Sequence, residues 1–256
     1  MMVPSDDSQK PVLLSIVVPV LNEEKLLSNT LSLFTADIKR RYRCELVVSD
    51  GGSTDDSVTI AEQFADVVVQ HTGEGRQTIA EGRDKGAMAS HGKVIVFLNG
   101  DTVPNDVESF LAVVLEFVER KGRYAQASAL ACPVQIYTSE RTRFDSAFHT
   151  AYNGWVWLLN ALRIGAGRGE CQIVRRDVYD AVGGYKHNLA AGEDFDLLAR
   201  IGLQARVMFA TELLVLESPR RFRRFGYFRI LWWWTVNALS VMITGKSSSD
   251  EWEPVR

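Results

Sequence analysis

Short runs of aliphatic and β-branched residues alternate with longer amphipathic stretches along the first hundred residues of this chain. The short runs occupy residues 14–20, 45–49, 67–70 and 94–98. Strands buried on both faces appear in sequence as apolar runs of this length, and intervening helices are typical of parallel sheets. The pattern therefore predicts an α/β domain built on a Rossmann-like, mostly parallel sheet.

Apolar positions three or four residues apart predict the helices. Leu27, Leu31, Phe34 and Ile38 form one stripe, so we expect a single helix after the first strand. Further helices are predicted over residues 55–64, 77–89, 107–117, 141–162, 177–182 and 195–201. Further strands are predicted over residues 125–137 and 171–174, near Val207 and near Leu214. We expect residues 1–10 and 247–256 to be flexible and residues 11–246 to form one domain.

Composition and charge exclude several classes of protein. The chain has 256 residues, 46% of them hydrophobic, and a formal net charge of -3, which describes a globular domain without general attraction for nucleic acid. Its three cysteines lie far apart and predict neither a disulfide framework nor a zinc site. The N-terminus lacks the pattern of a secretory signal, and no apolar run reaches the ~20 residues that cross a bilayer. We expect a cytoplasmic protein, and peripheral contact with the inner face of the membrane stays open.

Ligands of parallel α/β domains bind outside the carboxyl ends of the strands, so the residues there are the first candidates for a site. Pro19 and Glu23 lie at the end of the first run, and Asp50, Gly51 and Gly52 follow the second. The Asp50 carboxylate can accept a hydrogen bond from a planar base, and the two glycines leave room for its ring. The alternative is that the polar residues in both segments only cap the helices that follow.

Two further positions in the first half could bind a phosphate or its metal. Asp101 stands beside Gly100 at the end of the fourth run, where one carboxylate can bind a hard cation that also binds phosphate oxygens. The alternative there is an ordinary turn, which Asn99-Gly100 also favours. Arg76 follows two glycines at a loop-to-helix junction, where backbone N–H groups and the guanidinium could hold a phosphate.

Glu193 and Asp194 open a predicted helix in the second half of the chain. Acidic residues stabilise the dipole at a helix N-terminus, which is the simpler explanation of the pair. Beside a cleft, adjacent carboxylates can instead raise one another's pKa and leave one of them as a general base.

Taken together, four segments resemble the glycosyltransferases of family 2. The segments are LSIVVPVLNEE at 14–24, ELVVSDGGSTDDS at 45–57, GRQTIAEGRDKGAMASHGKVIVFLNGDT at 75–102, and VRRDVYDAVGGY with GEDFDLLAR within 174–200. The resemblance is specific because all four occur in the family's order. It implies a GT-A fold, with a nucleotide-binding half at 11–102, an acceptor half at 103–219 and an Arg- and Trp-rich C-terminal helix at 220–246. It also implies an inverting hexosyltransferase that uses a nucleotide-sugar donor.

The resemblance also implies roles for matching residues. Pro19 and Glu23 border the nucleoside pocket, and Asp50 contacts the base. Asp101 binds Mg²⁺ or Mn²⁺ on the donor diphosphate, and Asp194 is the catalytic base with Glu193 beside it. The expected nucleotide-binding residues are Pro19, Glu23, Asp50, Gly51, Gly52, Arg76, Gly100, Arg220 and Arg221.

The chain departs from the family's pattern at two places. Asn99 stands where the D-x-D motif has its first aspartate, which removes one carboxylate from the expected metal site. The Q-x-x-R-W motif of processive synthases does not occur, so we expect a single transfer.

Three interpretations of the C-terminal segment remain open. Four arginines lie within residues 220–224, and apolar positions at helical spacing run from Phe225 to Ile243. Arg220 or Arg221 could close over the diphosphate. The other arginines, with the tryptophans at 232–234, could form a helix that lies on anionic lipid. The helix could instead pack on the core or form a homodimer.

Two other functions also stay open. A sugar-1-phosphate nucleotidyltransferase would carry a glycine-rich, lysine-bearing loop after the first strand, where this chain has PVLNEE. A catalytically silent nucleotide-sugar-binding protein is favoured by Asn99. UDP-sugars and GDP-sugars remain equal candidates for the donor, and both small-molecule and lipid-linked acceptors fit the sequence.

Overall fold

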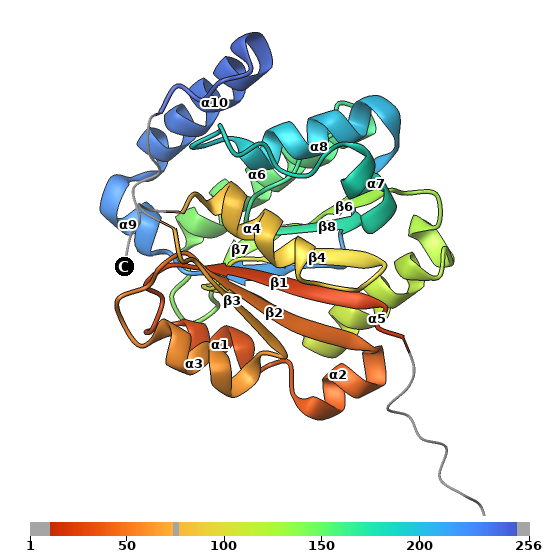
Figure 1. The fold of residues 1–256 in the computed structure, drawn as a ribbon. Helices are drawn as coiled ribbons and strands as arrows, with labels where there is room; N and C mark the ends of the chain where they lie inside the picture. The colour runs from red at the N-terminus through yellow and green to blue at the C-terminus, as the bar shows by residue number, and fades with distance from the viewer. Residues whose placement is uncertain (1–10, 74–76, 250–256) are drawn as a thin grey trace, which may run out of the picture.

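The architecture comes from a computed structural model that describes residues 11–73 and 77–249. A seven-stranded sheet forms its centre, with helices on both faces (Figure 1). In spatial order its strands are β3 (Val67–Gln70), β2 (Cys44–Asp50), β1 (Leu14–Val20), β4 (Val94–Leu98), β8 (Cys171–Arg175), β6 (Ala129–Ala131) and β9 (Val207–Phe209). The first four strands are parallel to one another, and β8 runs antiparallel to both of its neighbours. The predicted α/β fold with a mostly parallel sheet is confirmed.

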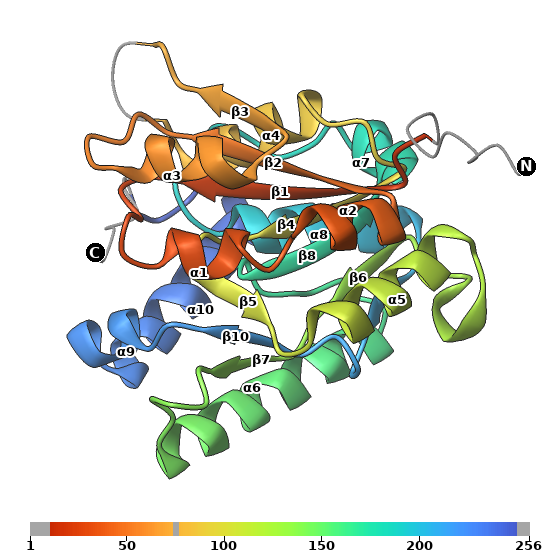
Figure 2. The ribbon, with the colours of Figure 1, turned by 90° about the horizontal axis from the view of Figure 1, so that it is seen from below.

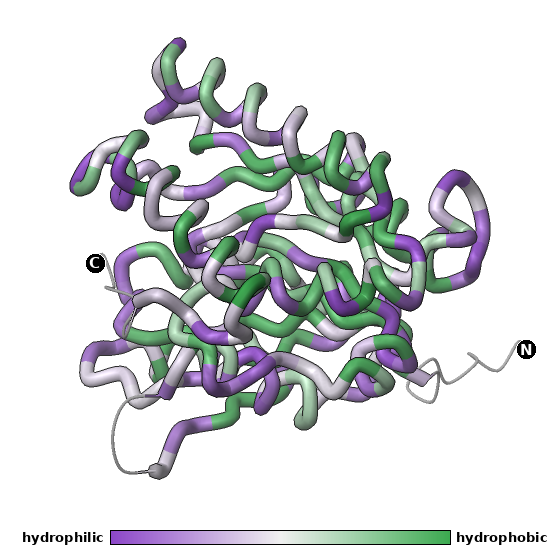
Figure 3. Tube along the Cα trace, turned by 90° about the horizontal axis from the view of Figure 1, so that it is seen from above, coloured by the Kyte–Doolittle hydropathy of each residue, from purple (hydrophilic) through white to green (hydrophobic). Residues whose placement is uncertain are grey.

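Two hydrophobic cores lie on opposite faces of this sheet. Along β1, Ile16 and Val18 enter one core while Val17 enters the other, because successive side chains of a strand point to opposite faces. Figure 3 shows hydrophobic stretches running through the middle of the trace. One core packs under α1 (Leu27–Leu31), α2 (Ala36–Tyr42), α3 (Ser57–Phe64) and α5 (Val107–Val118). The other packs under α4 (Ile79–Met88), α6 (Arg143–Ala161), α7 (Arg176–Ala181) and α8 (Glu193–Gln204).

The prediction of a single helix after the first strand is wrong, because the chain forms α1 and α2 instead. Thr35 takes an extended conformation between them, and its side chain accepts a hydrogen bond from the N–H of Ile38 at 3.3 Å. A side chain that caps a new helix satisfies a donor that a continuous helix would have bonded internally. The four residues of the predicted stripe are nevertheless all buried, so the stripe identified the core correctly.

The single strand expected over residues 125–137 is also wrong. The short helix η2 (Gly122–Tyr124) precedes β6 of the main sheet. After β6 the chain leaves that sheet and enters a second one as β7 (Val134–Ile136). Pro133 separates β6 from β7, and a proline has no N–H with which to continue a ladder. The second sheet has the order β5 (Thr102–Pro104), β10 (Val215–Glu217) and β7, and β5 was not predicted.

The C-terminal segment forms two helices rather than the one expected over 220–246. These are α9 (Arg220–Phe225) and α10 (Tyr227–Thr244), and Gly226 between them has a φ of 77°. Residues 247–249 fold back, since the Ser247 hydroxyl donates to the carbonyl of Ala191 at 2.8 Å and the N–H of Ser248 donates to Asn237 Oδ1 at 3.1 Å. Within the described ranges, no helix is both long and apolar enough to cross a membrane.

Asp145 attaches these C-terminal helices to α6. Its side chain is fully buried, accepts from the Thr142 N–H at 2.7 Å and from Arg223 Nη1 at 2.8 Å, and also accepts from the Tyr227 hydroxyl. The hydrogen bonds from Arg223 hold the pKa of Asp145 well below its usual range although burial opposes them. Figure 2 shows the result, with α9 and α10 beside one end of α6.

Asp145→Asn should lower the free energy of unfolding by about 1–3 kcal/mol, because a buried charge-assisted network loses its acceptor charge. The pKa of Asp145 is lowered on folding, so its contribution is present above about pH 4 and is lost as the pH falls below that. Urea titrations should therefore show the difference from wild type at neutral pH and a smaller difference in acid. Asp180→Asn, an exposed aspartate on α7, is the control. Equal stability of wild type and Asp145→Asn at neutral pH would contradict the assignment.

Candidate active site

A cavity of about 430 Å³ opens at the carboxyl ends of β1, β2 and β4. Its opposite wall comes from the first turn of α8 and from α9 and α10. Parallel strands bring their carboxyl ends to one edge of a sheet, which explains why segments far apart in sequence meet here. Nine of the residues singled out from the sequence line it: Pro19, Glu23, Gly51, Gly100, Asp101, Glu193, Asp194, Arg220 and Arg221.

The loops after β1 and β2 are joined to each other by hydrogen bonds. The Asn22 N–H donates to Ser53 Oγ at 2.8 Å, Asn22 Oδ1 accepts from the N–H of Thr54 at 2.8 Å, and the Glu23 N–H donates to Ser57 Oγ at 2.7 Å. The assigned N-cap residues of α1 and α3 make no side-chain cap bond, but Asp55 Oδ1 accepts from the N–H of Ser57, the first residue of α3, at 3.0 Å. Capping is therefore only part of what these polar residues do. They also fix one loop against the other and hold the rim of the cavity in place.

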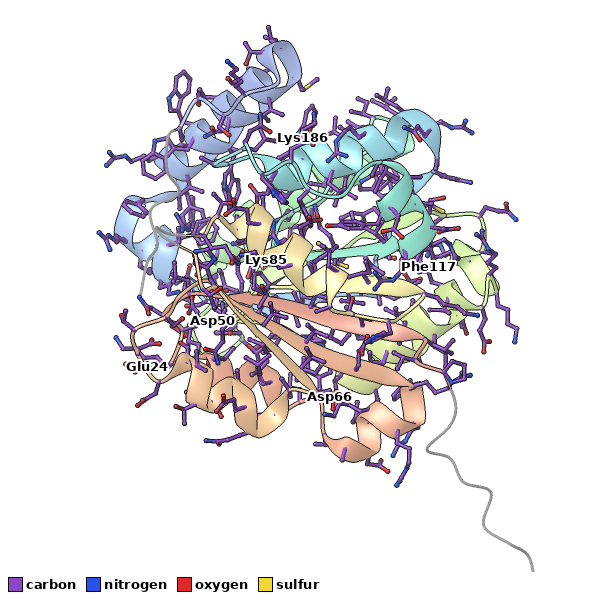
Figure 4. All side chains as sticks on the ribbon, in the orientation of Figure 1. Glu24, Asp50, Asp66, Lys85, Phe117 and Lys186 are labelled. Atoms are coloured by element: carbon purple, nitrogen blue, oxygen red, sulfur yellow. The ribbon has the colours of Figure 1, made fainter. Side chains whose placement is uncertain are left out.

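Asp50 and Gly52 shape the turn behind this rim. The Asp50 carboxylate accepts from the N–H groups of Gly52 at 2.9 Å and Ser53 at 3.0 Å. Gly52 has a φ of 94°, a conformation that glycine adopts without strain. Figure 4 shows Asp50 at the end of β2, on the side of the molecule that carries α9. Neither residue lines the cavity itself, so base contact by Asp50 stays a prediction.

Arg220 joins the two acidic residues at the strand ends. Its Nη2 atom lies 2.6 Å from Glu23 Oε2 and 3.0 Å from Asp101 Oδ2. The side chains of Glu23, Asp101 and Arg220 are all less than a quarter exposed. One guanidinium therefore contacts both carboxylates that the resemblance assigned to a nucleotide and its metal. The neighbouring Arg221 also lines the cavity, and burial lowers its pKa to about 10, so it stays charged at neutral pH.

Asp194 and Glu193 lie at the other end of the cavity, in the first turn of α8. Burial, followed by the charge of Glu193, raises the pKa of Asp194 to about 7. Glu193 is itself bound to Arg83 of α4, whose Nη1 donates to Glu193 Oε1 at 2.8 Å while the Arg83 side chain is 1% exposed. Of the two adjacent carboxylates, one is therefore held in a buried ion pair and the other is poised to exchange a proton near neutral pH.

Gly169 provides the space in which this arrangement is possible. A β-carbon at Gly169 would lie 3.0 Å from Asp194 Oδ2 and 3.2 Å from Arg83 Nη2. The Gly169 carbonyl also accepts from Arg83 Nη2 at 2.6 Å, and the same nitrogen donates to Asn99 Oδ1 at 3.0 Å. Asn99 therefore serves as an acceptor for the buried arginine.

A second buried cluster in the cavity wall was not predicted. Arg168 donates from Nη2 to Glu170 Oε1 at 3.0 Å and to Glu217, and its Nη1 lies 2.9 Å from His149 Nδ1. Burial and the charge of Glu170 raise the pKa of Glu217 well above its usual value, whereas burial and Arg168 lower the pKa of His149 to about 3. Glu217 is the last residue of β10, the strand predicted near Leu214, but that prediction gave no end at which to look for site residues.

Other lining residues were missed because nothing in their local sequence marks them. Arg83 is one of many polar residues in an amphipathic helix, and Tyr152 and Trp234 follow the apolar spacing of α6 and α10. Their position beside the cavity depends on how those helices pack. Arg76, expected to hold a phosphate, lies outside the described residues.

The carboxylates of the cavity fit a divalent cation only in part. Within residues 11–73 and 77–249, no group of three or more His, Cys, Asp and Glu side chains is arranged to hold a metal ion. Asp101 offers one carboxylate, and the Arg220 guanidinium already lies against it. Mg²⁺ in proteins is commonly held by one or two carboxylates together with substrate phosphates and water. The site is therefore compatible with a metal that arrives with a phosphorylated ligand.

The fold is of the GT-A type: a Rossmann-like α/β domain whose cavity lies at the carboxyl ends of the parallel strands. The chain belongs to glycosyl transferase family 2, which matches residues 15–183. In sequence it is 28% identical over 97 residues to the glycosyltransferase AglE of Haloferax volcanii, an alignment that covers 36% of this chain and 31% of AglE. The aligned part is thus about a third of that relative.

Solved structures of low sequence identity share the fold. The mannosyltransferase PcManGT of Pyrobaculum calidifontis, solved with GDP-Man and Mn²⁺, matches with a TM-score of 0.59 and 15% identity over 83% of this chain and 58% of its own. S. aureus TarS 1-349, solved with UDP-GlcNAc, matches with a TM-score of 0.62 and 18% identity over 81% of this chain and 58% of its own. This chain thus spans less than two thirds of either structure.

The buried Arg83–Glu193 pair predicts strong coupling between two variants. Arg83→Met and Glu193→Met should each lower the free energy of unfolding by about 3–5 kcal/mol, since each leaves an unpaired charge in the interior. The double variant should lose less than the sum of the two. Urea titrations measure all three, with the exposed pair Lys121 and Glu119 substituted in the same way as the control. Additive losses from Arg83→Met and Glu193→Met would show that the pair is not coupled.

Proposed function

We propose that this chain is an inverting glycosyltransferase that moves a sugar from a nucleotide-diphosphate donor to an acceptor hydroxyl. The observation that carries the proposal is the cavity itself, which joins the strand ends at Glu23 and Asp101 to Asp194. One end has the arginine and carboxylates suited to a diphosphate and its metal, and the other has a carboxylate whose pKa is raised to about 7. Membership of family 2 supports the same reaction.

The donor's nucleotide is assigned to the strand ends. Pro19 and Gly51 line this end of the cavity, and the turn held by Asp50 lies directly behind them. Residues 11–102 then act as the nucleotide-binding half and residues 103–219 as the acceptor half. PcManGT was solved with GDP-Man and TarS with UDP-GlcNAc, so GDP-sugars and UDP-sugars both remain candidate donors for this chain.

The diphosphate is assigned to the space between Asp101 and the two arginines of α9. Arg220 would exchange its bonds to Glu23 and Asp101 for bonds to phosphate oxygens, which suit a guanidinium equally well. Mg²⁺ or Mn²⁺ bound at Asp101 would offset the negative charge that develops on the leaving diphosphate. Arg221, which stays charged in the cavity wall, would contribute in the same direction.

Asp194 is assigned as the general base. The acceptor oxygen forms the new bond to the anomeric carbon, the bond from that carbon to the diphosphate oxygen breaks, and the acceptor proton passes to Asp194. Attack from the face opposite the leaving group inverts the anomeric centre and requires donor and acceptor to be held in line. The elevated pKa suits this role, because a base near neutrality combines an ionised form with the ability to hold a proton.

The acceptor is assigned to the part of the cavity beside Tyr152, Trp234 and Asn237, which come from α6 and α10. A single transfer is proposed because the motif of processive synthases does not occur in this sequence. Both small and lipid-linked acceptors fit this assignment. The second candidate function is a catalytically silent nucleotide-sugar binder, which Asn99 favours and which the next experiment separates from the enzyme.

Asp194→Asn should reduce transfer by at least about 100-fold, because the base can no longer take up the acceptor proton. Donor binding should survive, since the nucleotide lies at the other end of the cavity. Release of nucleoside diphosphate from a panel of UDP- and GDP-sugars measures transfer, and calorimetry measures binding. Asp196→Asn is the matched control, because Asp196 shares the first turn of α8 but pairs with Lys186 and Arg200.

The pH dependence gives a second readout of the same residue. Transfer should rise with pH through about 7, as Asp194 loses its proton. The folded-state pKa of Asp194 lies above the unfolded value of about 3.9. As the pH rises from about 4 to 7, the wild type should therefore lose stability relative to Asp194→Asn. Near-normal transfer by Asp194→Asn would remove the residue from the mechanism. Donor binding without transfer by the wild type, across a broad panel of acceptors, would favour the silent binder.

Asp101→Ala should remove the effect of Mn²⁺ on UDP or GDP binding in calorimetry. Arg220→Gln should have two opposite effects: tighter binding of Mn²⁺ alone, because the competing guanidinium at 3.0 Å is gone, and weaker binding of the nucleotide. Arg229→Gln, on α10 and outside the cavity lining, is the control. If Mn²⁺ changes nucleotide binding equally in the wild type and in Asp101→Ala, Asp101 is not the metal ligand.

A further inference from the structure

Two helices beside the cavity carry large aromatic side chains on their outer surfaces. Trp155 and Trp157 of α6 are 54% and 53% exposed, and Trp232 and Phe228 of α10 are 67% and 83% exposed. Large aromatic residues normally dominate cores and interfaces, so several of them on adjacent helices require an explanation. Their inner neighbours are buried in the ordinary way, which shows that the helices are already packed on one side.

The outer face of α6 carries no charge after its first residue, Arg143. Between Arg143 and Arg163, the ionisable acidic and basic side chains are Asp145 and His149, and both are buried. The exposed positions between those two arginines are Phe144, Ala147, Thr150, Ala151, Gly154, Trp155, Trp157, Leu158, Ala161 and Leu162. A surface helix of a protein surrounded by water usually presents charged residues on the face opposite the core. After Arg143, α6 is largely apolar both on the face toward the core and on the face opposite it.

The outer face of α10 is similar. Arg229 is the single charged residue between Tyr227 and Thr244, and its guanidinium lies 4.9 Å from the centre of the Trp233 ring. The exposed positions of the apolar stripe are Phe228, Trp232, Leu239, Met242 and Ile243. Their spacing of four, seven, three and one places them along one side of the helix.

The two helices lie side by side at their N-terminal ends. The rings of Phe144 and Tyr227 are 5.1 Å apart, and the rings of Tyr152 and Trp234, about two turns further along each helix, are 5.2 Å apart. The contacts follow the same order along both helices, so the helices run in the same direction here. We call the exposed apolar residues of the pair the helix-pair face. It comprises Phe144, Trp155, Trp157, Leu158 and Leu162 of α6 with Phe228, Trp232, Leu239, Met242 and Ile243 of α10.

The surroundings of the helix-pair face are basic. Residues 218–249 contain five arginines and one lysine and no Asp or Glu, whereas residues 250–256, outside the described structure, contain Asp250, Glu251 and Glu253 with Arg256. Of the arginines in 218–249, Arg220 and Arg223 bind carboxylates inside the protein. Exposed Arg143 and Arg163 flank α6, and exposed Lys246 follows α10. Among the residues that the structure describes, the border of this apolar face is therefore cationic, even though the whole chain has a net charge of -3.

We propose that the helix-pair face binds the headgroup region of a membrane that contains anionic lipid. Aromatic side chains favour the boundary between acyl chains and headgroups, and arginines beside them attract anionic headgroups. Neither helix is long and apolar enough to span a bilayer, so the contact is peripheral. A two-fold dimer through this face would oppose the cationic borders formed by the described residues of the two copies, which argues against a second copy as the occupant.

The cavity lies on the inner side of the same helices. Tyr152 of α6 and Trp234 and Asn237 of α10 line it, so the helix pair separates the cavity from the surface that would meet lipid. A helix with its side chains is about 10–12 Å across, so the cavity would lie within that distance of the headgroups. A preference for lipid-linked acceptors follows only if the chain is a glycosyltransferase, whereas lipid binding does not depend on that activity.

Sedimentation of the full chain with vesicles tests the proposal. The probes are vesicles of phosphatidylcholine alone and of phosphatidylcholine mixed with phosphatidylglycerol. We expect wild type to sediment with the mixed vesicles, and the double variant Trp155→Ala with Trp232→Ala to partition at least about tenfold less. The matched control is Leu203→Ala with Met88→Ala, which removes two apolar side chains that are more exposed than either tryptophan, from α8 and α4, and should bind like the wild type.

A charge-reversal variant keeps the test informative if the tryptophan variant fails to fold, which circular dichroism would reveal. Arg143→Glu with Arg229→Glu should weaken binding to mixed vesicles at low salt, and raised salt should weaken binding of the wild type. Wild-type protein that sediments no better with mixed vesicles than without vesicles would overturn the proposal. So would equal binding by the tryptophan variant and its control. A dimer in analytical ultracentrifugation that the tryptophan variant abolishes, without vesicle binding, would assign the face to a second copy.

Discussion

The structure depends on how six carboxylates are balanced within one cavity. Glu23, Asp101, Glu170, Glu193, Asp194 and Glu217 all line it. Carboxylates removed from water need partners, and Arg83, Arg168 and Arg220 supply them from α4, the segment before β8 and α9. These arginines therefore join distant parts of the chain. Asp194 accepts no bond from them, and it is the carboxylate whose pKa rises to about 7.

Much of the fold could be predicted because its strands are buried on both faces, which produces continuous apolar runs. The errors came where one local feature competed with that pattern: Thr35 caps a new helix, and Pro133 directs the chain into a second sheet. The site was predictable where polar residues follow a recognised strand, as at Glu23 and Asp101. It was not predictable where tertiary packing decides, as for Arg83, which reaches the cavity only because α4 lies against α8.

The two faces of the α6 and α10 pair connect the cavity to the outside of the molecule. Their inner residues line the cavity, and Asp145 holds the pair together through Arg223 and Tyr227. A contact on the helix-pair face would therefore bear directly on the wall proposed for the acceptor. The C-terminal segment thus places a guanidinium in the cavity wall and packs on the core, and its outer surface is the one that we propose binds lipid.

The central claim is that one nucleotide-sugar site runs from the strand ends to Asp194. A crystal structure of the chain with Mn²⁺ and a nucleotide sugar identified by thermal-shift screening tests it most directly. The account predicts the nucleotide at the ends of β1 and β2, the diphosphate beside Asp101 with Arg220 moved onto it, and the sugar facing Asp194. A nucleotide bound elsewhere, or one bound here while Arg220 keeps its bonds to Glu23 and Asp101 and the sugar points away from Asp194, would contradict it.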